Sequence, residues 1–94
     1  MTMYLITRTA QFKRAYKLAV KRGLNMSNLN EVIGLLAMGE PLPARCRDHE
    51  LVGRHVGKRE CHVAPDWLLV YRKIEAQLIL ELLDTGSHSD LRLG

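Results

Sequence analysis

The segment Pro41-Leu42-Pro43 divides the chain into two parts with different hydrophobic patterns. Proline lacks a backbone N–H and has a fixed φ angle, so a helix that ends at Gly39 cannot resume across this segment. Before it, apolar residues recur with the spacing of amphipathic helices, whereas after it short apolar runs alternate with turn residues. The sequence therefore predicts helices followed by strands, the order of an α+β fold.

Two helices are expected in the first part. Thr9 is a suitable N-cap for a helix over residues 10–22. Its apolar stripe comprises Phe12, Tyr16, Ala19 and Val20. A second helix is expected over residues 29–38, with Asn28 and Glu31 as a capping box. Its buried stripe comprises Leu29, Val32, Ile33 and Leu36.

Four β-prone runs complete the pattern, at residues 4–6, 59–63, 67–72 and 77–83. The 67–72 run is continuously apolar, which favours a central strand. The order is β-α-α-β-β-β, and we expect a two-helix hairpin packed on a small, mainly antiparallel twisted sheet. With 94 residues, positions 1–94 should form a single domain.

The basic residues are concentrated at the start of the chain. Residues 1–30 contain six Lys or Arg and no Asp or Glu, whereas the remainder contains eight basic and ten acidic residues. The net charge of +4 therefore comes from the first third. Such a concentrated positive field attracts nucleic acid or an acidic protein partner, although a solvated helix face would have the same composition.

Several classes of protein do not fit the sequence. No apolar stretch approaches the roughly 20 residues of a membrane span. The N-terminus has no basic lead-in, so no signal peptide is expected and the cytoplasm is the expected compartment. Cys46 and Cys61 lack a CxxC spacing and should be free thiols. No His or Cys pair has close ligand spacing, so neither a metal nor another cofactor is expected.

Three histidines with charged neighbours, His49, His62 and His88, are the main candidates for chemistry. Imidazole is the side chain most easily set to exchange protons near neutral pH, and RNA is a substrate that needs little more. Asp66, in a Pro-Asp turn, is a further candidate, although Asp is common in turns for backbone hydrogen bonding alone. A hydrogen-bonded strand histidine is the alternative for each imidazole, and His55 should lie on the surface.

Two blocks, His62-Val63-Ala64-Pro65-Asp66-Trp67 and Thr85-Gly86-Ser87-His88, together with Asp48-His49, resemble the YafQ-type toxins of the RelE/ParE superfamily. The similarity extends over nearly the whole chain. It implies a RelE-like fold and an mRNA interferase that cuts messages on the ribosome without a metal. It also implies a cognate antitoxin, expected to be acidic and of the DinJ or RelB type, that covers the active face.

The resemblance also implies roles for individual residues. The catalytic set would be His49, His62, Asp66 and His88. His88 is expected to be the general acid, His49 or Asp66 the general base, and His62 a stabilising or substrate-holding group. RNA contacts are expected from Lys13, Lys17, Lys58, Arg59 and Trp67, although a Trp that opens an apolar strand is also typical of a core.

The chain departs from the family pattern at two places. Asp84 stands where the family usually has an arginine, and Leu91 is followed by Arg92 rather than a phenylalanine. An aspartate there would repel a phosphate, so Arg59, Arg72 and Arg92 are candidates to compensate. Two further functions stay open: a weakened toxin that only binds its antitoxin, and a ParE-like toxin that targets a protein and does not need the histidines.

Overall fold

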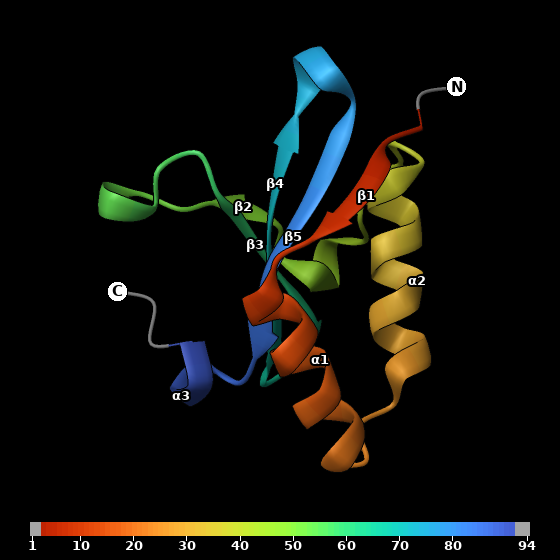
Figure 1. The fold of residues 1–94 in the computed structure, drawn as a ribbon, viewed down its shortest axis with the longest axis vertical. Coiled ribbons are helices and arrows are strands. Elements are labelled where there is room, and N and C mark those ends of the chain that lie inside the picture. Colours follow the sequence, from red (N-terminus) through yellow and green to blue (C-terminus); the bar gives the residue numbers. More distant parts are fainter. Residues whose placement is uncertain (1–2, 92–94) are drawn as a thin grey trace.

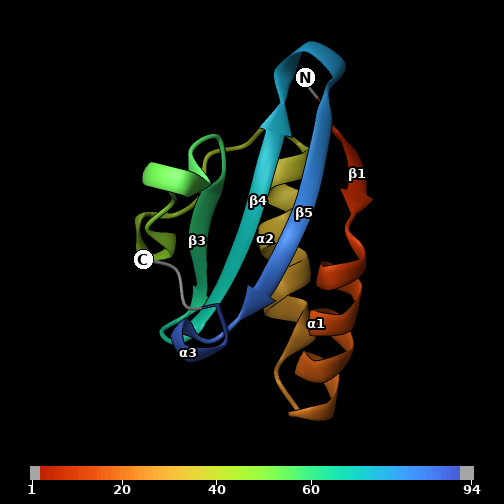
Figure 2. The same ribbon diagram turned by 60° about the vertical axis from the view of Figure 1, so that its left-hand side comes forward.

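The computed structural model describes residues 3–91, which form a five-stranded sheet with two helices on one face (Figures 1 and 2). The helices are α1 (Ala10–Lys21), α2 (Met26–Ala37) and the single-turn α3 (His88–Leu91). The strands are β1 (Leu5–Arg8), β2 (His49–Glu50), β3 (Arg59–Ala64), β4 (Trp67–Ile74) and β5 (Ile79–Gly86). Short 3₁₀ turns occupy Ala44–Cys46, Gly53–His55 and Glu75–Gln77.

The strands lie in the order β1-β5-β4-β3-β2. Only β1 pairs in parallel, with β5, and the other neighbours are antiparallel. The predicted α+β fold, with a helical hairpin on a mainly antiparallel sheet, is confirmed. This topology places the start of β4 and the end of β5 side by side, because Leu68 pairs with Gly86. The segment that follows β5 therefore lies next to the β3–β4 turn.

The core lies between the helix pair and one face of the sheet. Trp67, Leu69 and Tyr71 alternate along β4 and point toward the helices, as strand geometry requires. The predicted helix stripes supply the opposite side of this core, except that the prediction for Val20 is wrong, because this residue is 53% exposed. The buried helical members of the core are Phe12, Ala19, Leu29, Val32, Ile33, Leu36 and Ala37. Leu68 and Val70 are also buried although they lie on the other face of β4.

The first helix forms as predicted, with the Thr9 side chain accepting the Phe12 N–H at 3.0 Å. The predicted start of the second helix is wrong. Asn25 caps it by accepting the Ser27 N–H at 3.2 Å, so α2 begins at Met26 and Asn28 lies inside its first turn. An Asn at either position can accept such a bond, and the sequence pattern favoured the later one because of Glu31.

The β4–β5 hairpin is longer than predicted. Ile74 pairs with Ile79, so the connection between the runs predicted at 67–72 and 77–83 begins later than expected, at the 3₁₀ turn Glu75–Gln77. Thr85 and Gly86, beyond the run predicted at residues 77–83, belong to β5, where they pair with Leu69 and Leu68. Within residues 3–91, no helix is both long enough and apolar enough to cross a membrane.

Candidate active site

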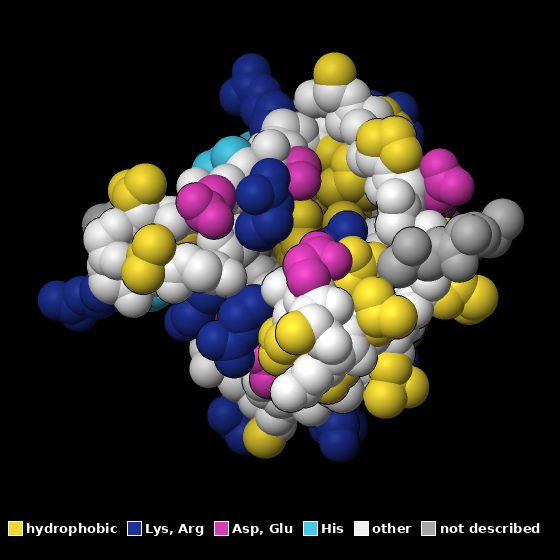
Figure 3. Space-filling model, turned by 90° about the horizontal axis from the view of Figure 1, so that it is seen from above, with side chains coloured by type: hydrophobic (Ala, Val, Ile, Leu, Met, Phe, Trp, Pro, Cys, Tyr) yellow, Lys and Arg dark blue, Asp and Glu magenta, His cyan; other side chains and the backbone are white. Residues whose placement is uncertain are grey.

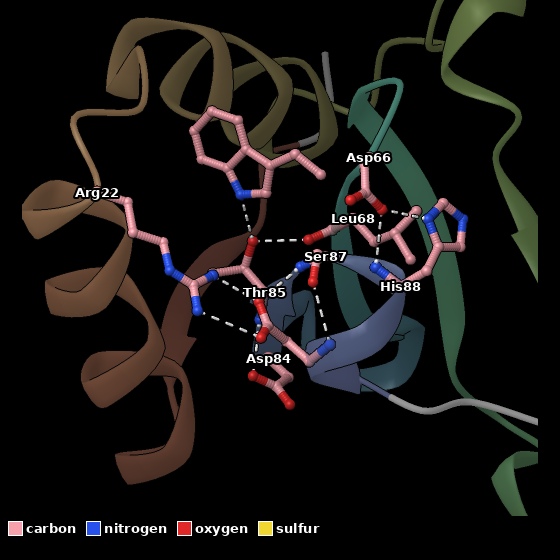
Figure 4. A network of polar contacts seen from close by, with 9 residues as sticks. Arg22, Asp66, Leu68, Asp84, Thr85, Ser87 and His88 are labelled. Carbon is pink, nitrogen blue, oxygen red and sulfur yellow. Dashed lines mark hydrogen bonds and ion pairs between the residues drawn. The ribbon is translucent and has the colours of Figure 1, made fainter.

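The Thr85-Gly86-Ser87-His88 motif has a separate structural role for each of its first three residues (Figure 4). The buried Thr85 hydroxyl donates to the Leu68 carbonyl at 2.6 Å and accepts the Trp67 Nε1–H at 2.9 Å. At Gly86, an added Cβ would lie 2.8 Å from the Cβ of Asp90, so only glycine allows α3 to pack this closely. These contacts fix the end of β5.

Ser87 and Asp90 then cap α3 reciprocally. The Ser87 N–H donates to Asp90 Oδ2 at 2.9 Å, and the Asp90 N–H donates to Ser87 Oγ at 3.1 Å. Arg22, at the end of α1, donates to the same carboxylate at 2.6 Å and 3.3 Å. The Arg22 guanidinium holds the pKa of Asp90 well below its usual range. A four-residue helix is thus anchored to α1 and to β5.

The anchored turn presents His88 to Asp66, which lies in the β3–β4 turn. Asp66 Oδ1 accepts both the His88 backbone N–H at 3.0 Å and the His88 Nδ1–H at 2.6 Å (Figure 4). These bonds lower the pKa of Asp66, the backbone N–H being the larger cause. The ionised Asp66 carboxylate accepts a hydrogen bond from His88 Nδ1 and so favours a proton on that nitrogen. His88 Nε2 is then available to exchange a proton.

His62 completes a cluster of three predicted residues. Its ring lies 5.5 Å from that of His88, measured between centroids, with the two planes inclined by 59°. His62 pairs with Leu68 in the ladder between β3 and β4, so it lies on the face of the sheet opposite the helices. The half-buried His62 and the exposed His88 are therefore close together and open to solvent.

His49 lies on β2, one strand farther out. It pairs with Glu60, whose side chain shares a face of β3 with His62 because the two are two residues apart. Its Nε2 is 3.6 Å from Glu60 Oε1, and its Nδ1 is 2.7 Å from the Arg47 carbonyl. His49 is thus on the same side of the sheet as His62 and is held by Glu60 and the Arg47 carbonyl, whereas Asp66 and His88 are bonded to each other.

Trp67, proposed as an RNA contact, belongs to the core. It is only 4% exposed, and its Nε1–H is used by Thr85. A base cannot stack on a ring that is covered by protein, so the prediction of a stacking role is wrong for Trp67. Its alternative, a core residue at the start of an apolar strand, is correct.

The four basic residues expected to bind RNA do not gather at the histidines. Arg59 points to the helix side of β3, where it donates to Asp48 at 3.1 Å. Lys58 precedes β3, roughly 13 Å along the strand from His62. Lys13 and Lys17 line a separate hollow between α1 and α2. The end of the molecule in Figure 3 mixes acidic with basic side chains, so it offers no continuous basic surface.

Of the three arginines expected to compensate for Asp84, two form ion pairs with carboxylates and the third lies outside the described residues. Arg59 is paired with Asp48 as above, and Arg72 donates to Glu81 at 2.7 Å. Arg92 lies outside the described residues. Asp84 itself accepts the Gln11 side chain at 2.7 Å and the Thr85 N–H at 2.8 Å. Partial burial raises the pKa of Asp84.

Two arginines that the sequence did not single out lie beside the cluster. Arg45 and Arg47 line a hollow of about 570 Å³ together with His62, Asn28 and the β3–β4 turn. The hollow has the size of a small-ligand site. In the sequence, the only indication of this cation site is the pair of arginines flanking Cys46. It is the packing of that turn against β3 that brings the two arginines to His62.

Both cysteines are buried and free. Burial raises the pKa of the Cys61 thiol to about 12, so it is a core residue rather than a nucleophile. Among residues 3–91, no three His, Cys, Asp or Glu side chains form a cluster suited to hold a metal ion.

Comparison with known proteins identifies the family. Residues 4–93 match the family described as bacterial toxin of type II toxin–antitoxin system, YafQ. The chain belongs to the YafQ toxin family. The mRNA interferase toxin YafQ of Escherichia coli K12 is 39% identical over 84 residues, which span 88% of this chain and 89% of that protein.

Solved structures of YafQ relatives have the same fold. The E. coli DinJ–YafQ toxin–antitoxin complex contains a chain that is 37% identical, with a TM-score of 0.86 and coverage of 95% of this chain and 97% of that one. A metal-bound toxin from Helicobacter pylori is 39% identical, with a TM-score of 0.89 and coverage of 95% and 99%. The YafQ resemblance stated from the sequence is therefore confirmed, together with its fold.

Proposed function

We propose that this chain is an mRNA interferase toxin that cleaves messages on the ribosome by acid–base catalysis. The observation that carries the proposal is the His62–His88 pair, 5.5 Å apart, with Asp66 bonded twice to His88. Two imidazoles at this separation can lie on either side of one ribose-phosphate linkage. The E. coli relative is an mRNA interferase, which supports the same activity here.

The reaction needs no external nucleophile, because RNA carries a 2′-hydroxyl next to each phosphate. In the proposed step, His62 takes the proton of the 2′-hydroxyl, and the 2′-oxygen forms a bond to phosphorus. The bond from phosphorus to the 5′-oxygen breaks, and His88 Nε2 gives its proton to that oxygen. The products are a 2′,3′-cyclic phosphate and a 5′-hydroxyl, and the step itself requires no metal ion.

This assignment refines the roles expected from the sequence. Asp66 was one of two candidates for the base, but its Oδ1 is committed to His88, which favours a positioning role. His49, the other candidate, is held by Glu60 and the Arg47 carbonyl. His62 is the imidazole next to His88, so we assign it the base and assign His49 to substrate binding.

We also propose that a cognate acidic antitoxin, of the DinJ type, inhibits the toxin. The DinJ–YafQ complex of E. coli provides the precedent. On this chain, α1 and α2 enclose a hollow of about 310 Å³ with an apolar floor and a basic rim. Its lining comprises Arg8, Phe12, Lys13, Tyr16, Lys17, Asn30 and Ile33. A segment with acidic and apolar side chains would complement both parts.

Primer extension on a translated message, with and without ribosomes, tests the activity. The unmodified chain should give cleavage that depends on ribosomes. His88→Ala and His62→Ala should each lower cleavage by about 10²-fold or more, since that is the usual contribution of one positioned acid or base. His55→Ala is the matched control and should cleave like the unmodified chain. Absence of cleavage by the unmodified chain, or full activity of His88→Ala, would overturn the proposal.

Asp84 favours a second function, in which a weakened toxin only binds its antitoxin. Reversion to the family residue, Asp84→Arg, separates the two. If the unmodified chain cleaves messages and arrests growth, the interferase assignment stands. If only Asp84→Arg arrests growth, this chain is the weakened form.

A further inference from the structure

Within residues 3–91, the cluster of His62, Asp66 and His88 includes no lysine or arginine, although its chemistry requires a cation. Cleavage of a phosphodiester builds negative charge on the phosphate oxygens, and positive groups aimed at those oxygens lower the barrier. Residue 84, where the family resemblance implies an arginine, is an aspartate that accepts a hydrogen bond from Gln11 of α1. Its carboxylate points away from the His88 ring in Figure 4. Among residues 3–91, the positive charge would therefore come from another segment.

The hollow beside His62 contains two suitable groups. Arg45 and Arg47 both line it, and both are exposed. Within residues 3–91, neither guanidinium is paired with a carboxylate, in contrast to Arg22, Arg59 and Arg72. Two unpaired guanidinium groups beside an imidazole form an environment that favours a phosphate, because each offers several N–H donors to its oxygens.

The segment that carries these arginines is held firmly by its neighbours. Cys46, between them, is 3% exposed and is part of the core, so the flanking side chains must face outward. The carbonyl of Arg47 bonds His49 Nδ1 at 2.7 Å, which links this turn to β2. Asp48 accepts from both Tyr71 and Arg59. Contacts of Cys46, the Arg47 carbonyl and Asp48 thus hold the backbone of the turn in place, and the two arginine side chains extend from it.

We propose that Arg45 and Arg47 bind a phosphate group of the RNA substrate next to His62, in place of the arginine that is absent at position 84. The inference rests on the proposed function. It assigns the substrate-binding cations to the turn after the Pro41-Leu42-Pro43 segment, which lines the hollow beside His62. Asn28, from the first turn of α2, lies at the same hollow and adds an uncharged hydrogen-bonding group.

The test is the affinity of the purified toxin for a short single-stranded RNA whose scissile ribose is a 2′-deoxyribose, which prevents cleavage. Arg45→Gln/Arg47→Gln should weaken binding at least tenfold at low salt. It should also reduce the slope of log affinity against log salt concentration by about 0.7, since each neutralised single-strand phosphate contributes about 0.7. Arg45→Lys/Arg47→Lys should restore the slope. Arg54→Gln, an exposed arginine outside the hollow, is the matched control.

Both altered side chains are exposed, so the melting temperature of the double glutamine variant should match that of the Arg54→Gln control. Equal affinity and equal salt slope for these two variants would overturn the inference, as would an unmodified chain that does not bind the RNA. Cleavage measurements separate this result from the proposed function. A chain that loses activity with His88→Ala but binds RNA equally well without Arg45 and Arg47 would retain the function and lose the inference.

Discussion

His88 and Asp66 are joined twice, through the His88 backbone N–H at 3.0 Å and through its Nδ1 at 2.6 Å, both to Asp66 Oδ1. These two hydrogen bonds orient His88 at two points, the backbone N–H and the imidazole ring. They also connect the β3–β4 turn to α3. The whole β4–β5 hairpin separates these two segments in the sequence. The geometry of the site therefore depends on correct pairing of that hairpin.

Replacement of Asp66 by Asn should slow cleavage more than it weakens RNA binding. The amide oxygen can still accept one bond, but the charge that favours a proton on His88 Nδ1 is lost. We expect kcat to fall by up to about 10⁴-fold, the effect of the corresponding Asp-to-Asn change beside the catalytic histidine of serine proteases, with KM nearly unchanged. Steady-state cleavage of a translated message measures both constants. An unchanged kcat would contradict the positioning role.

The pair Arg22–Asp90 should make stability depend on pH. The pKa of Asp90 is lower in the folded chain than its usual value of about 3.8, chiefly because of Arg22. Its contribution is therefore fully present above pH 4 and is lost as the pH falls toward the folded-state pKa. We expect Asp90→Asn to melt at a lower temperature than the unmodified chain at pH 7. The gap between the two melting temperatures should narrow as the pH is lowered below 4, and it should close only near the strongly lowered folded-state pKa of Asp90. A gap that stays constant as the pH is lowered would contradict the prediction.

Gly86 and Gly34 should respond to alanine in opposite ways. At Gly86 the new Cβ would meet the Cβ of Asp90 at 2.8 Å and displace α3, whereas nothing lies within 4 Å at Gly34. Gly86→Ala should lower stability by about 1–3 kcal/mol, as overpacking does, and should reduce cleavage with it. Gly34→Ala, inside α2, should raise stability by about 0.5–1 kcal/mol. Urea unfolding of both variants checks this, and a neutral Gly86→Ala would refute the close-approach argument.

Trp67 should contribute to stability and not to RNA contact. Trp67→Phe keeps an aromatic ring but loses the Nε1–H that Thr85 accepts. We expect a loss of about 1–3 kcal/mol, from one buried hydrogen bond and the reduced side-chain volume. Thermal unfolding measures the loss, and affinity for the 2′-deoxy RNA should not change. A variant that is fully stable but binds RNA weakly would show that Trp67 contacts the substrate.

Some features followed from the sequence because their causes are local. The Thr9 cap, the helix stripes around Phe12 and Leu29, and the order of helices and strands depend on residues a few positions apart. Helical and strand periodicities report which face is buried without any knowledge of the partner. Where two local signals competed, as Asn25 and Asn28 did for the start of α2, the pattern was not sufficient.

Only the tertiary structure decided which side chains meet at the site. The Asp66–His88 pair, the burial of Trp67 under Thr85, and the positions of Arg45 and Arg47 beside His62 all join segments distant in the chain. Such contacts depend on strand register and on how the 3₁₀ turn at Cys46 packs against β3. A one-residue shift in register would send each strand side chain to the opposite face. The sequence thus determined the residue types available for catalysis, and packing selected those that lie together.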